Sequence, residues 1–396
     1  MLTREREQRV INLCQALVRQ KSCSGHENGV VEQMKLAFRE FSFDEIIVDK
    51  YGSVLGRISG RQPGKTILLD GHIDVIPVPD ESKWTHAPYG GELAGGKIYG
   101  RGTSDMKGAV AAMTAAAGFF AADTQRNFAG TIYVSGVVHE ECFEGIAARE
   151  ISRRIHPDCV IIGESSELNL KRGQRGRAEV VVETFGKPAH SANPRVGVNA
   201  VYQMAELISA IRKLPESEHP VLGKGILELT DIKSSPYPGA SVVPDYCRAT
   251  YDRRLLVAET MESVLRPIHE LIAAIERHDP ECNAKASFAE GKLPCYTGEQ
   301  IGGVRFFPGW VLDAGDELVQ KSLAGLRAAG LHPELTQYSF CTNGSHYAGE
   351  AGIKTIGFGP SRENLAHTID EYIEVDQLLQ ATSGYYGILQ ALLQKA

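Results

Sequence analysis

Apolar and polar positions along the first part of the chain predict alternating helices and strands. Residues 5–19 and 28–40 carry apolar side chains at helical spacing. Short apolar runs follow in "TILLDGHIDV", "TIYVSGVVHE" and "CVIIGE", and helical stretches separate them in "SDMKGAVAAMTAAAGFF" and "CFEGIAAREISRRI". Alternation of this kind predicts an α/β fold in which helices flank a mostly parallel sheet.

The pattern changes after "LKRGQRGRAEV". An alternating strand, "EVVVETFG", precedes an amphipathic helix over residues 199–214, two strand-like runs and a second amphipathic helix over residues 260–278. This β-α-β-β-α-β order is typical of a ferredoxin-like α+β module. The α/β pattern resumes near residue 289. We therefore predict a larger, discontinuous domain formed by residues 1–177 and 289–396, and an inserted lid domain formed by residues 178–288.

Composition and charge narrow the range of partners. With 396 residues, 43% hydrophobic and 23% charged, the chain has the make-up of a soluble globular protein. The formal charge of −7 provides no basic stripe for nucleic acid, so we expect a small molecule or peptide as partner. The start "MLTREREQRV" has no apolar segment, and residues 109–122 are too few to cross a bilayer. These features predict a cytoplasmic protein with no membrane contact.

Eight cysteines occur without a C-x-x-C pair or regular spacing. This distribution argues against a disulfide framework and against a zinc site made of thiolates.

Acidic and imidazole side chains lie where the predicted strands end. His72 and Asp74 are two residues apart on an extended segment, so they share a face, and Asp74 can hold the second ring nitrogen of His72. Glu140 and Glu141 follow the next strand and Glu164 follows another, while Asp105 lies where a Gly-rich loop enters a helix and His367 lies near the C-terminus. Ligand sites of α/β sheets form beyond the carboxyl ends of strands, so these side chains are expected to converge.

The motifs also resemble a known family. "GHIDVIPV", "GRGTSDMKGAVAA", "HEECFEG", "GES", "GKPAHSANPRVGVNA" and "AHTIDEYI" occur in this order and span nearly the whole chain. They resemble the two-zinc metallohydrolases that include acetylornithine deacetylase, succinyl-diaminopimelate desuccinylase, aminoacylase and glutamate carboxypeptidase. The nearest branch looks like the bacterial hydrolases associated with selenium metabolism, a label that names no reaction. The resemblance implies a zinc-exopeptidase-like fold for the larger domain.

A pair of divalent metals is implied by the same resemblance, zinc first, with cobalt or manganese as alternatives. Asp105 would bridge them, and the peptide bond after Asp105 would be cis. One metal would also take His72 and Glu164, and the other Glu141 and His367. Two dications carry about four positive charges, which three ligand carboxylates and a bridging hydroxide offset. A fourth carboxylate ligand would exceed this charge, so Glu140 is expected to have another role.

The implied mechanism is hydrolysis with Glu140 as general base. Glu140 would take a proton from a metal-bridging water and deliver it to the leaving amine, with Asp74 supporting His72. The resemblance further implies that His190, in the lid, stabilises the oxyanion, usually in the active site of a partner subunit. It thus implies a homodimer formed through the lid domain. The alternative for His190 is a lid-strand residue that is hydrogen-bonded locally.

The substrate end of the site is expected to differ from that of relatives. The family motif D-x-R assigns Arg254 to the substrate carboxylate, and Arg253 is the alternative. Ser241 stands where many relatives have Asn, and Ser345 and His346 stand in a "GSH" segment where "GTD" is common. His139 replaces an Asp that often precedes the two glutamates, and a place in the wall is expected for it. These four differences leave the proposed metal ligands unchanged.

The resulting prediction is a co-catalytic dinuclear metallohydrolase that cleaves the amide bond of an N-acyl amino acid or small peptide-like substrate. A dipeptidase or carboxypeptidase of the same family is the first alternative; Glu164, where some peptidase branches have Asp, favours the deacylase. A binding protein that keeps the metals without catalysis is the second alternative. A serine hydrolase lacks support because "GESSE" has no G-x-S-x-G elbow.

Overall fold

The chain divides into two compact units. The computed structural model describes residues 2–394. Unit 1 comprises residues 2–174, Lys292–Gly302 and 311–394, and unit 2 comprises Arg175–Gly291 and Gly303–Trp310. Residues 303–310, which the sequence pattern assigned to the larger domain, lie in unit 2 because strand β19 (Phe306–Phe307) pairs with strand β9 (Gly176–Phe185).

The large sheet of unit 1 has nine strands in the order β1-β2-β6-β3-β7-β22-β8-β20, with β21 paired to β8. Their bounds are β1 Glu45–Val48, β2 Val54–Ser59, β3 Gln62–Asp70, β6 Ala129–Gly136, β7 Cys159–Ile162, β8 Leu170–Gln174, β20 Trp310–Val311, β21 Leu335–Tyr338 and β22 Lys354–Gly357. β3 runs parallel to β6 and to β7, and β22 runs parallel to β7. The predicted α/β fold with a mostly parallel central sheet is confirmed, and antiparallel strands β1 and β2 extend one edge.

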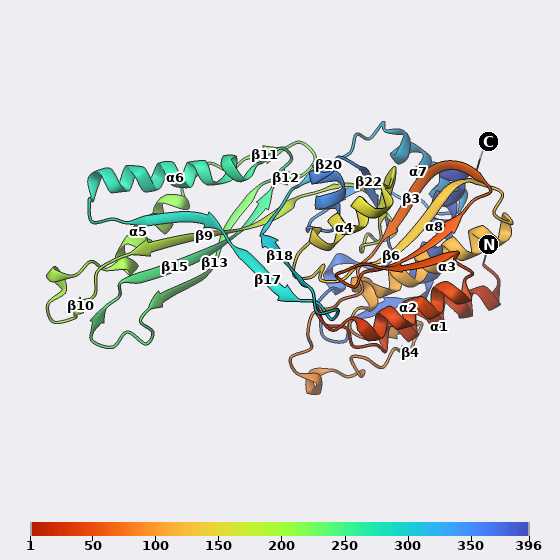
Figure 1. Cartoon of the computed structure of the whole chain (residues 1–396), viewed down its shortest axis with the longest axis horizontal. Helices are drawn as coiled ribbons and strands as arrows, with labels where there is room; N and C mark the ends of the chain where they lie inside the picture. The colour runs from red at the N-terminus through yellow and green to blue at the C-terminus, as the bar shows by residue number, and fades with distance from the viewer. Residues whose placement is uncertain (1, 395–396) are drawn as a thin grey trace. The chain divides into compact units, whose positions relative to one another are not determined.

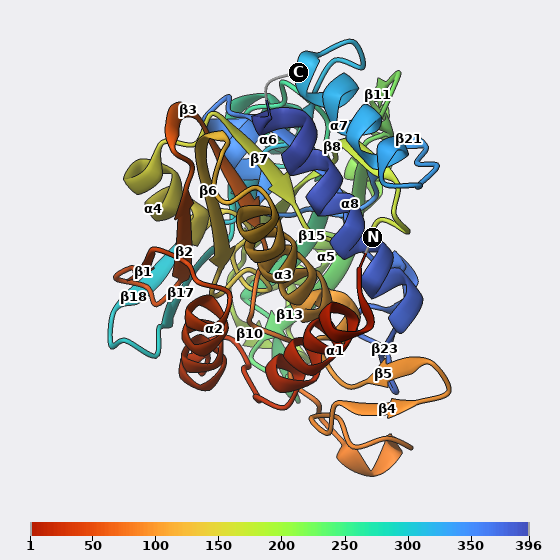
Figure 2. The same cartoon turned by 90° about the vertical axis from the view of Figure 1, so that its right-hand side faces the viewer.

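Helices cover both faces of this sheet. They are α1 Arg4–Val18, α2 Asn28–Glu40, α3 Gly108–Asp123, α4 Ile146–Ile155, α7 Glu317–Ala328 and α8 Val375–Leu393. β6 and β7 lie on opposite sides of β3, so right-handed crossovers place α3 and α4 on opposite faces. Figure 2 shows this arrangement, with α3 beside α8 on one face and α4 on the other.

Helix α3 is the most deeply buried helix of unit 1. All its residues from Gly108 to Ala121 are buried, because its many alanines allow α1 and α8 to approach closely. The same helix begins directly after the segment that carries Asp105. A rigid, fully packed helix therefore fixes the position of that segment.

The central parallel strands end at one edge of the sheet. β3 ends at Asp70, β6 ends at Gly136 and β7 ends at Ile162. The loops that follow them carry the candidate site residues His72, Glu140, Glu141 and Glu164. Parallel alignment therefore collects these side chains at one edge, as the pattern predicts.

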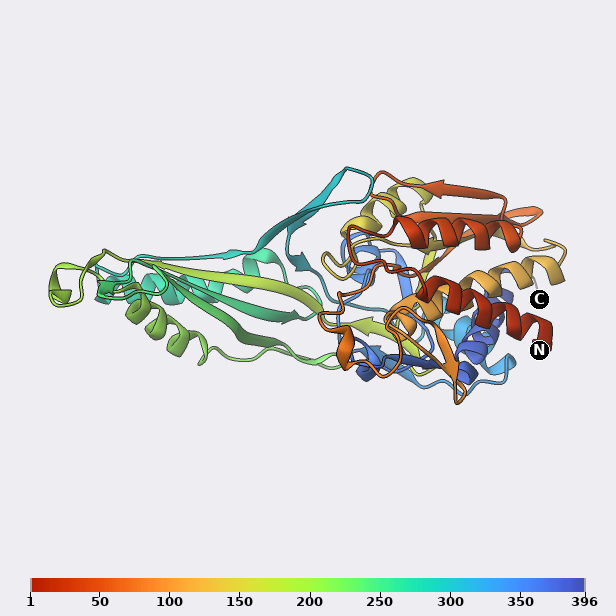
Figure 3. The same ribbon diagram turned by 90° about the horizontal axis from the view of Figure 1, so that it is seen from below.

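Unit 2 contains a separate antiparallel sheet in the order β13-β15-β9-β16. Its strands and helices are β13 Ile226–Ser235, β15 Tyr246–Leu255, β16 Ala284–Phe288, α5 Ala200–Ile211 and α6 Met261–His278. Figure 3 shows the long strands β9, β13 and β15 side by side, and α5 and α6 lie beside this sheet in Figure 1. The unit has its own apolar core, and α6 begins with a capping box formed by Thr260 and Ser263.

Short strands complete the fold. They are β4 Glu92–Ala94, β5 Lys97–Tyr99 and β23 Tyr372–Glu374 in one small sheet, and the pairs β10 Ala189–His190 with β14 Val242–Val243, β11 Glu218–His219 with β12 Gly223–Lys224, and β17 Glu290–Pro294 with β18 Gln300–Val304. All eight cysteines are free thiols. Among residues 2–394 we find no helix that combines the length and the apolar character needed to span a bilayer.

Candidate metal centre

His72 and Asp105 form the centre of the site. His72 follows β3 and is 1% exposed, and its Nε2 lies 2.9 Å from Oδ1 of Asp105. Asp105 lies in the segment Thr103–Lys107, where the peptide bond to Met106 is cis, as the resemblance implies. Oε1 of Glu164, after β7, is 3.5 Å from the same nitrogen of His72. These three residues come from different loops and meet at one atom of His72.

The second oxygen of Asp105 faces a different histidine. Nε2 of His367 lies 3.1 Å from Oδ2 of Asp105 and 3.0 Å from Oε2 of Glu141. The carboxylate of Asp105 thus stands between two imidazoles and presents one oxygen to each. A carboxylate in this position has the geometry expected of a bridging ligand.

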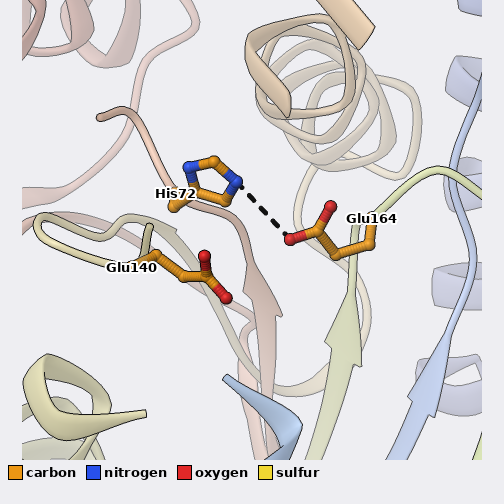
Figure 4. Close-up of side chains that lie close together, drawn as sticks. All are labelled: His72, Glu140 and Glu164. Atoms are coloured by element: carbon orange, nitrogen blue, oxygen red, sulfur yellow. Dashed lines mark ion pairs between the residues drawn. The ribbon is translucent and has the colours of Figure 1, made fainter. Parts of the chain in front are cut away.

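Glu140 points toward the His72 side of the group. Figure 4 shows His72, Glu140 and Glu164 directed toward one another, with the dashed line marking the His72–Glu164 pair. Ligand atoms of these three residues lie within 4.8 Å of one another, and so do those of His72, Asp105 and Glu141. Oε1 of Glu140 is buried and accepts no hydrogen bond within the described chain. The side chain of Glu140 is therefore available to a molecule in the site.

Burial dominates the electrostatics of the carboxylates. Burial, followed by repulsion from Asp105, raises the pKa of Glu164 to about 8 and also raises the pKa of Glu141. Burial raises the pKa of Glu140 well above its usual value, and repulsion from Glu164 adds to this. The pKa of Asp105 is lowered: burial opposes this, but hydrogen bonds from His367 and His72 prevail.

The residues fit a pair of divalent cations. Four carboxylates converge at the site: Asp105, Glu140, Glu141 and Glu164. Burial raises the pKa values of the three glutamates, so their ionised forms are costly and the protein alone compensates that cost incompletely. Two dications would supply the missing positive charge. Imidazole and carboxylate are ligands that zinc accepts, and manganese and cobalt share them. The donor set therefore agrees with the metal chemistry that the sequence predicts.

Asp74 contacts both His72 and the glutamate pair. The Nδ1 of His72 is 2.9 Å from the backbone oxygen of Asp74 and 3.6 Å from its carboxylate. The carboxylate of Asp74 also accepts the backbone N–H groups of Glu140, at 3.0 Å, and Glu141, at 3.2 Å. Ser24 donates a further hydrogen bond to it at 2.7 Å. Asp74 thus orients His72 through its main chain and holds the glutamate pair through its side chain.

The residues predicted at the substrate end fall into both units. Ser345 and His346 lie in unit 1, in the segment Ser345–Glu350, and their side chains are already engaged. Ser345 donates to the backbone oxygen of Thr342, and His346 uses both ring nitrogens, on Ser152 at 2.6 Å and on Glu350 at 2.8 Å. We therefore leave Ser345 and His346 out of the proposed substrate site.

Unit 2 carries the other three predicted residues. His190 is exposed on β10, where its Nδ1 accepts the backbone N–H of Ala192, the local hydrogen bond of the alternative interpretation. Arg254 forms an ion pair of 2.7 Å with Asp252, which lies on the same face of β15. The backbone of Ser241 is in the left-handed region, with a φ of 59°.

Arg253 and His139 are both held within their own units. Both adjacent arginines form an ion pair, but the side chain of Arg253, paired with Glu259, is 13% exposed against 30% for Arg254, so Arg253 is the less available of the two. His139 is fully buried, and burial lowers its pKa. Full burial favours a packing role for the side chain of His139.

Glu350 gives a pH-dependent contribution to stability. Its carboxylate accepts a hydrogen bond from His346 and two from Arg149. Burial alone would raise the pKa of Glu350, but these donors outweigh it and lower the pKa from 4.5 to about 2. Because the folded protein favours the ionised form of Glu350, this residue stabilises the fold above pH 4.5. The contribution is lost as the pH falls toward 2 and the side chain takes up a proton. Glu350→Gln should therefore lower the free energy of unfolding at pH 7 by about 1–2 kcal/mol, a value reduced for solvent screening. Urea unfolding at pH 7 and pH 3 measures this, and an equal loss at both pH values would contradict it.

Imidazole and carboxylate side chains that gather at the strand ends of a mixed sheet, flanked by helices, are typical of a metallohydrolase. The family model described as "Peptidase family M20/M25/M40" matches residues 68–391. The chain belongs to this family, which confirms the resemblance stated from its motifs, and it is a hydrolytic metalloenzyme.

Relatives of different description are similar over nearly their full length. "Uncharacterized protein YgeY" of Escherichia coli strain K12 is 32% identical over 374 residues, covering 93% of this chain and 90% of the relative. "Succinyl-diaminopimelate desuccinylase" of Cereibacter sphaeroides strain KD131 is 28% identical over 390 residues, covering 94% and 96%. The solved structure of aminopeptidase PepT from Bacillus cereus ATCC 10987 has a TM-score of 0.76 at 20% identity and covers 98% of both chains.

Three residues near the site escaped the sequence analysis. Glu371 and Arg101 form a buried ion pair beside the segment of Asp105, and Ser104 precedes Asp105. The only sequence signal for Glu371 is its place in "AHTIDEYI", where an acidic residue resembles an ordinary loop residue. Its burial, and hence its role, depends on contacts across the fold.

Proposed function

We propose that the protein hydrolyses the amide bond of an N-acyl amino acid with a pair of divalent metals, zinc first. The observation that carries this proposal is the carboxylate of Asp105, which presents one oxygen to His72 and the other to His367. In the proposal, His72 and Glu164 would hold one metal, Glu141 and His367 would hold the other, and Asp105 would serve both. When bound, the metals would polarise the scissile carbonyl and make water a stronger acid.

Glu140 moves the proton in this proposal. Its buried Oε1 has no hydrogen-bond partner within the described chain, so the carboxylate is free to accept a proton from the attacking water. The protonated side chain then donates that proton to the nitrogen of the leaving amine. Because Asp74 holds the backbone N–H groups of Glu140 and Glu141, the base and its ligand neighbour are fixed together.

The substrate end is proposed on residues of unit 2. Arg254 would bind the substrate carboxylate with its planar guanidinium, which suits bidentate pairing. His190 would donate to the oxyanion, and Ser241 would contact the substrate where many relatives carry Asn. His190 is exposed, which leaves its side chain accessible to substrate or to a partner subunit.

We further propose a homodimer formed through unit 2. Strand β13 is the outer strand of its sheet and exposes Ile226 and Ile232, at 40% and 49%. An edge strand of this kind can pair with a second chain. A molar mass of two chains by light scattering supports the dimer, and a mass of one chain contradicts it.

A substrate panel tests the proposed reaction. The purified protein is loaded with zinc, cobalt or manganese and offered N-acetyl and N-succinyl amino acids, dipeptides and tripeptides. We expect metal-dependent release of the amine from the N-acyl compounds, with smaller kcat/KM for the peptides. Preference for dipeptides would replace the deacylase with a dipeptidase. Absence of turnover on the whole panel, with metals bound, would overturn the enzyme proposal in favour of a binding protein.

A further inference from the structure

Glu371 concentrates its hydrogen bonds on the segment that leads into Asp105. Its Oε1 accepts the backbone N–H groups of Gly102, Ser104 and Asp105, at 3.0, 2.9 and 3.2 Å. Its Oε2 pairs with Arg101 at 2.5 Å. The side chain of Glu371 is fully buried and that of Arg101 nearly so. All four donors belong to one continuous stretch of chain.

A buried carboxylate is costly unless hydrogen bonds and a counter-charge compensate it. Here the compensation comes from a segment of the proposed metal site, so forming the ion pair also fixes the main chain before Asp105. Glu371 follows His367 in the same C-terminal segment. One side chain thus joins the segments of two proposed ligands, Asp105 and His367.

Ser104 joins the segment of a third ligand. Its hydroxyl donates to the backbone oxygen of Tyr372 at 2.6 Å, next to Glu371. Its backbone oxygen accepts a hydrogen bond from the hydroxyl of Ser165 at 2.9 Å. Ser165 directly follows Glu164. Ser104 therefore connects the segments that carry Asp105, Glu164 and His367, and it is only 2% exposed.

We propose that Glu371 and Ser104 are positioning residues that hold the carboxylate of Asp105 in its bridging place. The proposal rests on the dinuclear site described under the proposed function. Neither residue is a proposed metal ligand or the proposed base. Without them the segment 101–105 would be free to turn Asp105 away from one of the two histidines. The other ligands would still hold one metal, and the second metal would bind more weakly.

Cobalt binding tests this inference with a readout that does not depend on turnover. The variants are Glu371→Gln, which places an amide N–H₂ or a weaker acceptor against Arg101, and the milder Ser104→Ala. The control is Asp49→Asn, because Asp49 is a buried carboxylate of unit 1 that accepts the backbone N–H groups of Gly52 and Ser53 in a turn outside the site. Each protein is stripped of metal and titrated with cobalt against a competing chelator, while visible absorption and electron paramagnetic resonance follow the two ions.

We expect the parent and Asp49→Asn to bind two cobalt ions with magnetic coupling between them. Glu371→Gln and Ser104→Ala should bind the second ion about 10–100-fold more weakly, the range typical when residues that support metal ligands are replaced. The coupling signal should fall at cobalt concentrations that saturate the parent.

Each of three possible results would contradict a particular part of this interpretation. Parental affinity and coupling in both variants would contradict the positioning role. An equal loss in Asp49→Asn would assign the effect to general destabilisation and contradict it as well. A parent chain that binds fewer than two cobalt ions would instead contradict the dinuclear site itself. If Glu371→Gln fails to fold, Glu371→Asp decides the role of Glu371, because it keeps the buried charge and shortens the side chain, and Ser104→Ala decides the role of the Ser104 hydroxyl.

Discussion

Glu140→Gln is expected to lower kcat by about 10²–10⁴-fold while the metal content stays at the level of the parent. The amide keeps the size of the side chain and cannot accept the proton from water. Glu140 is not among the proposed ligands, so its replacement leaves His72, Glu164 and the bridging Asp105 in place. Steady-state kinetics with an N-acyl amino acid, together with metal analysis of the same samples, measure both quantities.

A matched control separates this effect from a general loss of charge. Glu150, at 7% exposed on α4, pairs with Arg153 at 2.7 Å and with Lys50 at 3.7 Å, and neither partner is a proposed ligand. Glu150→Gln should therefore leave kcat close to that of the parent. Turnover by Glu140→Gln at the parental rate would show that another group accepts the proton. Loss of metal in Glu140→Gln would place Glu140 among the ligands instead.

Removal of the metals is expected to reduce turnover to the level of the uncatalysed reaction. Zinc, manganese or cobalt would then restore it after the chelator is removed. The physical reason is that the carboxylates and imidazoles of the site have no other means of polarising a scissile carbonyl, a contribution of several kcal/mol to the barrier. Activity before chelation, after dialysis and after re-addition of each metal gives the measurement.

The metal-free protein should also be less stable than the loaded one. Burial, with repulsion from neighbouring carboxylates as a smaller cause, raises the pKa values of Glu140, Glu141 and Glu164, so keeping these glutamates ionised without metal costs free energy. Metal at 100 times its dissociation constant would add about 2.7 kcal/mol per site to the free energy of unfolding. Full activity in the presence of chelator, with metal analysis showing none bound, would contradict the proposed chemistry.

Strand order explains why the candidate ligands could be picked from the sequence. His72, Glu141 and Glu164 each follow a buried apolar run, and such runs form neighbouring parallel strands whose carboxyl ends coincide. The positions of these three residues along the chain are thus enough to predict that they converge. Their roles as ligands stay predictions until metal is located in the protein.

The same reasoning could not predict which side chains form hydrogen bonds with the main chain. The spacing of His72 and Asp74 suggested a contact between their side chains, which form an ion pair at 3.6 Å, but it gave no sign that the carboxylate of Asp74 also accepts the N–H groups of Glu140 and Glu141. Likewise, Ser345 and His346 occur in a segment that seemed open to substrate, but both are satisfied by neighbours in unit 1. Which partner a polar side chain chooses depends on the exact path of loops that lie far apart in the sequence.

By itself the sequence determined the alternation of elements, the family and the places where acids and histidines follow strands, because hydrophobic periodicity and residue order are local properties. Only the tertiary structure decided that Asp105 stands between His72 and His367, and that Glu371 is buried against the segment leading into Asp105. Those arrangements join residues that are distant along the chain. Their geometry is set by how the sheet, α3 and the C-terminal segment pack together, which no local pattern encodes.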